Sequence, residues 1–230
     1  MVQINTPYTN LRIKFRKVGD LQYISHLDLV RTMQKALKRA GIPMWYTEGF
    51  NPKPKMVFGP PLSIGVESEC EFLDIRLLGD MELGDVKRRI NESLTASLAA
   101  HDVYYPENSL TEIEWLSYTI TLRTNDTARL LCEKLSTFFD KNEINILKKT
   151  KKGEQNVNIR PLIKSFEIFE CDGGARINCV LSSSSQSFLN PEHLMRAIKE
   201  NSDVFTGDLV NETYTVLRER AYLADMTEFR

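Results

Sequence analysis

The same order of strand-like and helix-like patterns occurs twice along this chain of 230 residues. Each half opens with a segment in which apolar and polar residues alternate, as in a half-buried strand, and continues with apolar residues at helical spacing. In both halves the complete order is strand, helix, strand, strand, helix, strand. A chain with this repeat buries its apolar residues by pairing the strands into sheets and covering them with helices. The pattern therefore predicts an α+β fold built from two similar halves.

The first half begins with LRIKFRKV at residues 11–18, where apolar residues alternate with Arg12, Lys14 and Arg16. SHLDLVRTMQKALKRAG at residues 25–41 then has helical spacing and stops at a glycine, a frequent end signal. The apolar stripe of this helix is expected to comprise Leu27, Val30, Met33, Leu37 and Ala40. The further elements predicted in this half are strands at 43–48, 69–79 and 102–106 and a helix at 83–100.

The second half repeats the order from residue 115 onward. Its predicted elements are strands at 115–124, 143–150, 175–185 and 213–223 and helices at 126–141 and 190–202. This order is that of the ferredoxin-like, split βαβ arrangement, an antiparallel sheet with helices on one face. We therefore expect tandem duplicated ferredoxin-like units at residues 11–108 and 109–230, preceded by a flexible leader at residues 1–10.

The formal net charge of −1 conceals a strong asymmetry along the chain. Residues 11–61 carry ten Lys and Arg against three Asp and Glu, whereas residues 62–115 carry four against twelve. A basic block of this kind attracts a polyanion when its charges share one surface. RNA or tRNA is therefore a candidate partner for the first half of the chain.

The basic block contains an unusual loop, YTEGFNPKPKMVFGPPLSIGVES, at residues 46–68. Its first two prolines fix the backbone around Lys53 and Lys55, so that both ammonium groups are presented on a stiff segment. A stiff segment loses less conformational entropy when it binds phosphate. The two lysines are therefore candidate phosphate ligands.

Aromatic residues are interleaved with these lysines. Trp45 and Tyr46 can offer a stacking surface to bases, which is how many proteins bind single-stranded nucleic acid. The alternative is that the aromatic rings simply hold the loop against the core. We expect that role for Phe50 and Phe58.

The predicted helix at 25–41 carries a second group of cations, on the face opposite its apolar stripe. These residues are Arg31, Lys35, Lys38 and Arg39. Such a face is usually just solvated, but only one acid, Asp28, shares it. The sequence leaves open whether these charges merge with those of the strand at 11–18, because the helix can cover either face of a sheet.

Further cations lie in the second half of the chain. KKTKKGEQ at residues 148–155 is typical of an exposed, solvated hairpin tip. Arg160 precedes a proline and an apolar anchor, so its guanidinium can be held for bidentate contact with phosphate, or can pair with an acid of residues 67–85. The candidate RNA-binding residues are Arg12, Lys14, Arg16, Arg31, Lys35, Arg39, Lys53, Lys55 and Arg160.

His26 is the one candidate for catalysis. It stands in the first turn of the predicted helix, where the dipole favours the neutral imidazole that a general base needs. Helical spacing also places it near the apolar stripe, where a histidine bonded to backbone has a structural role. Its neighbours Ser25 and Asp28 have the spacing of a capping box and need no catalytic explanation. A catalytic His26 is therefore kept as the alternative.

The sequence shows no metal-binding signature. Cys70, Cys132, Cys171 and Cys179 have no CxxC spacing, and the three histidines have no partner at ligand spacing. We expect no cofactor, metal or cluster. There is also no signal-peptide pattern and no apolar run near the roughly 20 residues of a membrane span, so we expect a cytoplasmic protein without membrane contact.

Several motifs together resemble the uncharacterised bacterial family of radical SAM-linked proteins. They are a basic first strand, ISHLD at 24–28, YTEGFNP at 46–52, PLSIGVES at 61–68, and KKG followed by RPLI within 151–163. Members of that family occur beside, or fused to, a radical SAM enzyme with a cobalamin-binding segment. The resemblance therefore implies a separate radical SAM enzyme as partner. This chain lacks the cluster-binding cysteine triad, so no radical chemistry of its own is expected.

Three interpretations follow. The first is a non-catalytic RNA- or tRNA-binding accessory module for a separate radical SAM enzyme. The second is a metal-independent endoribonuclease with His26 as base and Lys53 or Arg160 stabilising the phosphorane. The duplicated element order is similar to that of CRISPR repeat-processing endoribonucleases, although no motif is shared. The third is a protein-binding adaptor without RNA, whose basic block docks onto an acidic protein surface.

Overall fold

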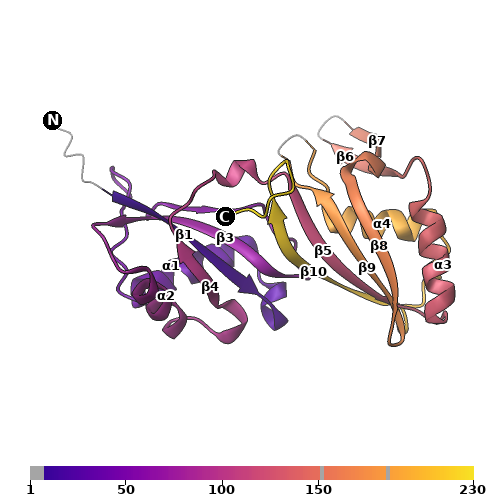
Figure 1. The fold of residues 1–230 in the computed structure, drawn as a ribbon, viewed down its shortest axis with the longest axis horizontal. Helices are drawn as coiled ribbons and strands as arrows, with labels where there is room; N and C mark the ends of the chain where they lie inside the picture. The colour runs from indigo at the N-terminus through magenta and orange to yellow at the C-terminus, as the bar shows by residue number, and fades with distance from the viewer. Residues whose placement is uncertain (1–7, 151–152, 185–186) are drawn as a thin grey trace. The chain divides into compact units, whose positions relative to one another are not determined.

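The computed structural model describes residues 8–150, 153–184 and 187–230. Contacts divide the chain into two compact units, Met1–Thr111 with Arg230 and Glu112–Phe229, here called unit 1 and unit 2. Within the described residues each unit combines two α-helices with an antiparallel sheet, so the fold is α+β (Figure 1). No helix in this part of the chain is long and apolar enough to cross a membrane.

Unit 1 consists of β1 (Tyr8–Lys17), α1 (His26–Arg39), β2 (Met56–Phe58), β3 (Val66–Leu78), α2 (Leu83–Glu92) and β4 (Ala100–Tyr104), with 3-10 turns at Gly19–Tyr23 and Ala96–Leu98. The strands lie in the order β4, β1, β3, β2, and each pair of neighbours is antiparallel. The register sets Arg12 opposite Asp74 and Lys14 opposite Phe72. Residues directly opposite each other point to the same face, so these four side chains share one face of the sheet.

The other face of this sheet is covered by both helices. One apolar cluster joins β1, β3, α1 and α2, and its members include Leu11, Ile13, Phe15, Leu29, Met33, Leu37, Leu73, Val86 and Ile90. Complete burial of such a side chain contributes roughly 1.5–3 kcal/mol relative to leaving it exposed. Because successive strand residues alternate between faces, Arg12 and Lys14 point away from α1.

α1 begins and ends at the signals in its sequence. The Ser25 hydroxyl accepts a hydrogen bond from the Asp28 N–H at 3.2 Å and donates one to the Asp28 carboxylate at 2.7 Å. Gly41 follows the helix with φ at +66°, a conformation that side chains disfavour. The buried stripe begins at Leu29, whereas Leu27, which was expected in it, is 56% exposed. Two residues correspond to about 200° of helix rotation, so the two leucines cannot share a face.

Unit 2 consists of β5 (Trp115–Arg123), α3 (Ala128–Phe139), β6 (Asn145–Thr150), β7 (Gly153–Asn158), β8 (Ile163–Cys171), β9 (Gly174–Ser182), α4 (Pro191–Asn201) and β10 (Thr213–Tyr222), with 3-10 turns at Leu110–Glu112, where the units meet in sequence, and Arg160–Leu162. Its main sheet has the order β10, β5, β9, β8, again antiparallel. β6 and β7 form a separate two-stranded sheet. α3 packs on the main sheet, where the rings of Phe139 and Phe166 stack at 4.6 Å between centroids.

Two boundaries predicted for the first half are wrong. The leader was expected to extend to residue 10, but Tyr8, Thr9 and Asn10 pair with β3 and belong to β1. Residues 1–7 of that leader lie outside the described residues. The helix expected at 83–100 ends at Glu92, because the Asn91 side chain bonds both the N–H and the carbonyl of Ala100 and turns the chain into β4.

The strand predicted at 43–48 is not a continuous strand. It makes only isolated bridges, from Met44 to Leu77 and from Tyr46 to Pro54. Pro43 and Pro54 carry no N–H, so a regular ladder cannot form through them. The edge position beside β3 is taken instead by β2.

The strand predicted at 143–150 exists as β6, but it does not enter the main sheet. It pairs with β7, and Arg196 and Asn201 of α4 donate hydrogen bonds to its Leu147 and Asn145 carbonyls. The place beside β9 belongs to β8, which the sequence pattern did not reveal. The N-terminal cap of α3 is Thr127, whose side chain accepts a hydrogen bond from the Leu130 N–H at 3.3 Å.

Candidate nucleic-acid interface

Arg12, the first cation of the basic strand, is not on the surface. Its guanidinium is 0% exposed and donates to both carboxylate oxygens of Asp74, at 2.7 and 2.8 Å. It also donates to the carbonyls of Asn108 and Arg230, at 2.8 and 3.0 Å. All of these partners belong to unit 1. Arg12 is thus a structural residue, and its predicted contact with RNA phosphate is incompatible with this burial.

The other cations of β1 are partly engaged. The ammonium of Lys14 lies 6.0 Å from the centre of the Phe72 ring, a cation–π contact. Arg16 donates to the Ala96 carbonyl at 2.7 Å. Both side chains remain half-exposed. Because Lys14 lies on the sheet face opposite α1, the strand and helix charges do not form one patch, which answers the question that the sequence left open.

The cations of α1 stay on the surface. Arg31 pairs with Asp28 at 3.3 Å, with both side chains more than half exposed, and Arg39 donates to the Ser93 carbonyl at 2.8 Å. Lys35 and Lys38 are exposed. Within the described residues, neither ammonium group forms a hydrogen bond or an ion pair. These two lysines are thus available to an external anion.

The loop at residues 45–55 is a backbone-bonded hairpin. The Lys55 N–H donates to the Trp45 carbonyl at 3.0 Å, and the Thr47 N–H donates to the Lys53 carbonyl at 2.8 Å. The Thr47 hydroxyl accepts the Lys53 N–H at 3.0 Å. At the tip, Gly49 has φ at +124°, which only glycine adopts readily. The loop is therefore held by backbone hydrogen bonds and leaves Lys53 exposed, as the sequence predicts.

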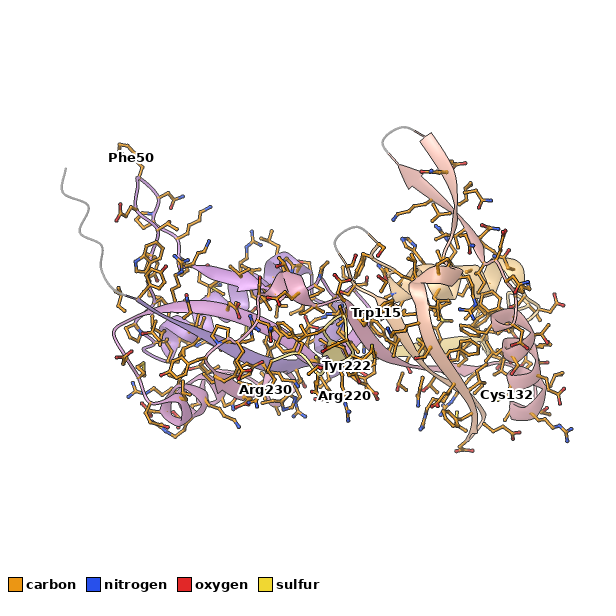
Figure 2. The ribbon with its side chains drawn as sticks, turned by 45° about the horizontal axis from the view of Figure 1, so that its top comes forward. Phe50, Trp115, Cys132, Arg220, Tyr222 and Arg230 are labelled. Atoms are coloured by element: carbon orange, nitrogen blue, oxygen red, sulfur yellow. The ribbon has the colours of Figure 1, made fainter. Side chains whose placement is uncertain are left out.

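Phe50 stands at the tip of this hairpin and points away from the protein (Figure 2). Its relative exposed area is 112%, so the expectation that it pins the loop to the core is wrong. Phe58 does pack inward, edge-on to Phe15 at 6.5 Å between ring centres. The difference follows from position, because a residue beside Gly49 at the turn has no sheet beneath it. An exposed aromatic ring is a typical stacking partner for an unpaired base.

The hairpin lies beside α1. A small cavity of about 60 Å³ between them is lined by Gln34 and Lys38 from α1 and by Tyr46 and Pro54 from the hairpin. Tyr46 is 43% exposed. Lys38 of α1 and the hairpin therefore adjoin at this cavity. The exposed charged and aromatic residues that we group here as the hairpin surface are Lys35, Lys38, Tyr46, Phe50 and Lys53, and one acid, Glu48, lies among them.

His26 lies on this side of unit 1 but is not buried in the apolar stripe. It is exposed, and its ring is edge-on to Phe58 at 5.3 Å. The cavity beside it, lined among others by Lys17, Glu71 and Pro60, has a volume of only about 10 Å³. That volume is about the space of a single water probe, so this cavity is too small to enclose a substrate group.

Arg160 is turned toward its own chain. It donates to the Ile163 carbonyl at 3.3 Å and lies 5.7 Å from the centre of the Phe166 ring. The neighbouring lysine run includes residues 151 and 152, which lie outside the described residues. Arg160 belongs to unit 2, whereas the residues of the hairpin surface belong to unit 1.

A larger cavity, of about 460 Å³, lies between α3 and the end of α4. Its lysines are already occupied: Lys134 bonds Asp126 and the Asp203 carbonyl, and Lys141 bonds the Asn201 carbonyl. Within the described residues no three His, Cys, Asp or Glu side chains gather as a metal site. Burial raises the pKa of Cys179 to about 12, which keeps this thiol protonated. Both lysines of this cavity are therefore engaged within the protein and are not free to bind an anion.

A comparison with protein-family models places this chain in a family. The family model described as "Uncharacterized protein conserved in bacteria (DUF2344)" matches residues 10–191. The chain belongs to the DUF2344 family. No curated protein matches the DUF2344 chain.

One solved structure shows a similar fold. A chain of the "Crystal Structure of a Cbf5-Nop10-Gar1 Complex" is similar with a TM-score of 0.52 at 10% identity, over 92% of this chain and 48% of that one. The DUF2344 chain thus spans about half the length of that neighbour. The "Crystal Structure of an Unknown Protein from Galdieria sulphuraria" matches at 9% identity over 92% and 99% of the two chains, with a TM-score of 0.26.

Proposed function

We propose that this DUF2344 chain is a non-catalytic RNA-binding module, with tRNA among the RNAs it can bind. The observation that carries the proposal is the hairpin surface, where one stiff loop carries both the fully exposed Phe50 and the exposed Lys53. A solvent-exposed phenylalanine buries nothing in the folded chain, so it contributes no packing energy there. Stacking against a base is a use for such a ring, and base–aromatic stacking contributes about 1–3 kcal/mol per base.

The exposed lysines of the hairpin surface suit a phosphate backbone. Lys35, Lys38 and Lys53 make no hydrogen bond or ion pair through their ammonium groups within the described residues, and each is exposed. Cations that neutralise phosphates release the counterions of the nucleic acid, which favours binding at low salt. The acidic residues of unit 1 lie mainly elsewhere in its sequence, between 62 and 111.

The partner in this proposal is a separate radical SAM enzyme, and the compartment is the cytoplasm. The support is the resemblance of the ISHLD, YTEGFNP and PLSIGVES motifs to radical SAM-linked proteins. In such a pair, the module would hold the RNA while the enzyme supplies the chemistry. Co-purification of the two proteins from their native host tests this part.

We also propose that the two units are ferredoxin-like copies. Within unit 1 the strands lie in the order fourth, first, third, second. The main sheet of unit 2 has the same order when β5, β8, β9 and β10 are counted as its four strands. Both arrangements are antiparallel, which supports a duplication with the β6–β7 hairpin as an insertion in the second copy.

The test of RNA binding is a charge reversal confined to the hairpin surface. The variant Lys35→Glu, Lys38→Glu, Lys53→Glu should lose affinity for total cellular RNA, and for tRNA if tRNA is bound, in filter-binding assays at low salt. If each lysine contacts one phosphate, the slope of log affinity against log salt should fall by about 2 for a single strand. Circular dichroism should show an unchanged fold, because all three side chains are exposed.

A matched control carries the same change of charge in unit 2. Arg129→Glu, Arg176→Glu, Arg220→Glu replaces three exposed arginines there. This variant should keep most of the RNA affinity. Equal losses of RNA affinity in both variants would show that only the net charge of the protein matters. If the native protein does not bind RNA, the protein-binding adaptor is favoured.

A further inference from the structure

A second site lies on the opposite face of the unit 1 sheet. It is a pocket of about 260 Å³ between β1, β2, β3 and the segment that follows β4. The residues that line the pocket include Asn10, Lys55, Val57, Arg76, Pro106 and Glu107. All of them belong to unit 1.

Arg76 is held in place by aromatic rings. Its guanidinium carbon lies 4.2 Å from the centre of the Tyr8 ring and 5.4 Å from that of Trp45. The two rings are 5.8 Å apart and tilted by 55°. The Trp45 N–H also donates to the Arg76 carbonyl at 2.8 Å, which ties the hairpin to β3. The guanidinium is therefore oriented before any ligand arrives, so less side-chain entropy is lost on binding.

The guanidinium of Arg76 donates no hydrogen bond within the described part of the chain. Within the described residues, neither the Arg76 guanidinium nor the Lys55 ammonium makes a hydrogen bond or ion pair. The pocket does contain two carboxylates. Asp74 is occupied by Arg12 through two hydrogen bonds, and Glu107 is exposed. The unpaired charges in this pocket are thus the two cations Arg76 and Lys55 and the single carboxylate of Glu107.

The remaining walls suit a base. Val57 is 43% exposed and, with Pro106, gives an apolar wall. Asn10 is exposed, and within the described residues its side-chain amide makes no hydrogen bond. An amide carries both a donor and an acceptor, which is what the edge of a base requires.

We propose that this pocket binds one nucleotide, with Arg76 and Lys55 on its phosphate and Asn10 on the edge of its base. The inference rests on the proposed RNA binding and adds a subsite to it: the pocket takes a single unpaired nucleotide of the bound strand. Lys55 belongs to the same hairpin that presents Lys53 and Phe50, so the strand can pass from the hairpin surface to this face over one stiff element.

The pocket can be tested alone with mononucleotides. The sequence has two tryptophans, so the variant Trp115→Phe leaves Trp45 as the one indole, next to Arg76. Uridine and adenosine 5′-monophosphates should shift the Trp45 indole N–H resonance saturably. Uridine, which lacks the phosphate, should bind at least about tenfold more weakly, because it cannot form the charge-assisted hydrogen bonds. Inorganic phosphate that bound as tightly as a nucleotide, or uridine that bound as tightly as its monophosphate, would overturn the assignment.

Variants of the pocket change the affinity in opposite directions. Arg76→Met should weaken monophosphate binding about tenfold or more, and Arg76→Lys should recover only part of it. Glu107→Gln should tighten binding about two- to fivefold by removing an exposed like charge. Arg129→Met, in unit 2, is the control and should leave binding unchanged. If Arg76→Met disturbs the fold, the Glu107→Gln variant still tests the site. An unchanged monophosphate affinity in Glu107→Gln would contradict the proposal.

The same proteins separate this inference from the proposed function. RNA binding that is lost in the hairpin-surface variant but unchanged in Arg76→Met would leave the function standing and remove the subsite. Monophosphate binding that depends on Arg76 in a protein without RNA affinity would keep the site and remove the RNA-binding function.

Discussion

Arg12 and Asp74 form a two-bond ion pair across β1 and β3, with the arginine side chain fully buried and the aspartate 25% exposed. Two further hydrogen bonds, to the Asn108 and Arg230 carbonyls, fix the guanidinium. A buried charge is tolerated only when its partners are complete. The pair therefore holds the segment after β4 and residue 230 against the sheet of unit 1.

Removal of one partner of this pair should destabilise the protein strongly. We expect Asp74→Ala to lower the free energy of unfolding by about 3 kcal/mol, because the Arg12 charge would remain buried and unpaired. Urea denaturation monitored by circular dichroism measures this. The double variant Arg12→Met, Asp74→Leu should be more stable than Asp74→Ala. The control is Asp80→Ala, an exposed change expected within about 0.5 kcal/mol, and equal stability of Asp74→Ala and this control would contradict the argument.

Phe50→Ala should separate binding from stability. Because the ring is fully exposed, the free energy of unfolding should change by less than about 0.5 kcal/mol. Loss of one stacked base should weaken RNA binding by about five- to a hundredfold, whereas Phe50→Trp should retain it. The matched control is Leu209→Ala, another exposed apolar residue at 92%, which should not affect binding. Unchanged RNA affinity in Phe50→Ala would show that the tip is not a stacking site.

His26→Ala tests the endoribonuclease alternative. The ring contacts Phe58 edge-on, and an aromatic pair contributes about 0.5–1.5 kcal/mol, so a modest loss of stability is expected. RNA affinity should be unchanged, and incubation of native protein with total RNA should give no cleavage products. Cleavage by the native protein that disappears in a folded His26→Ala variant would establish the enzyme.

Tyr214 should make unit 2 sensitive to alkaline pH. Burial, assisted by its hydrogen bond to Glu192 at 2.8 Å, raises the pKa of this phenol from 10.0 to about 12. Near pH 10 the unfolded chain loses this proton while the folded protein keeps it. The contribution to stability is therefore complete below pH 10 and is lost as the pH rises toward 12.

Thermal unfolding measured between pH 8 and about pH 12 checks this linkage. Tyr214→Phe should show a smaller fall of stability over that window than the native protein does. Tyr23→Phe, which changes a tyrosine that is 65% exposed, should follow the native curve. Burial also raises the pKa of Tyr104 to about 12, so part of the alkaline loss should persist in Tyr214→Phe. Identical curves for the native protein and Tyr214→Phe would refute the assignment.

Local signals in the sequence determined much of unit 1. Alternation located β1 and β3, the Ser25 cap and Gly41 delimited α1, and the prolines at 52 and 54 indicated a stiff loop. These features depend on residues close to one another in the chain, so a sequence contains them. The sequence also shows directly that the basic block includes Lys53.

The tertiary structure alone decided which of those residues are available. Alternation shows that Arg12 points away from α1, but its burial depends on Asp74, 62 residues away, and on Arg230, 218 residues away. The division of the cations between two sheet faces, the place of β8 instead of β6 beside β9, and the Tyr8–Trp45–Arg76 group arise from strand pairing and packing. Such contacts join residues with no local signature of their partner. The exposure of a side chain and its position relative to other side chains therefore depend on how the sheet packs, whereas most helices and strands of unit 1 follow from local sequence signals.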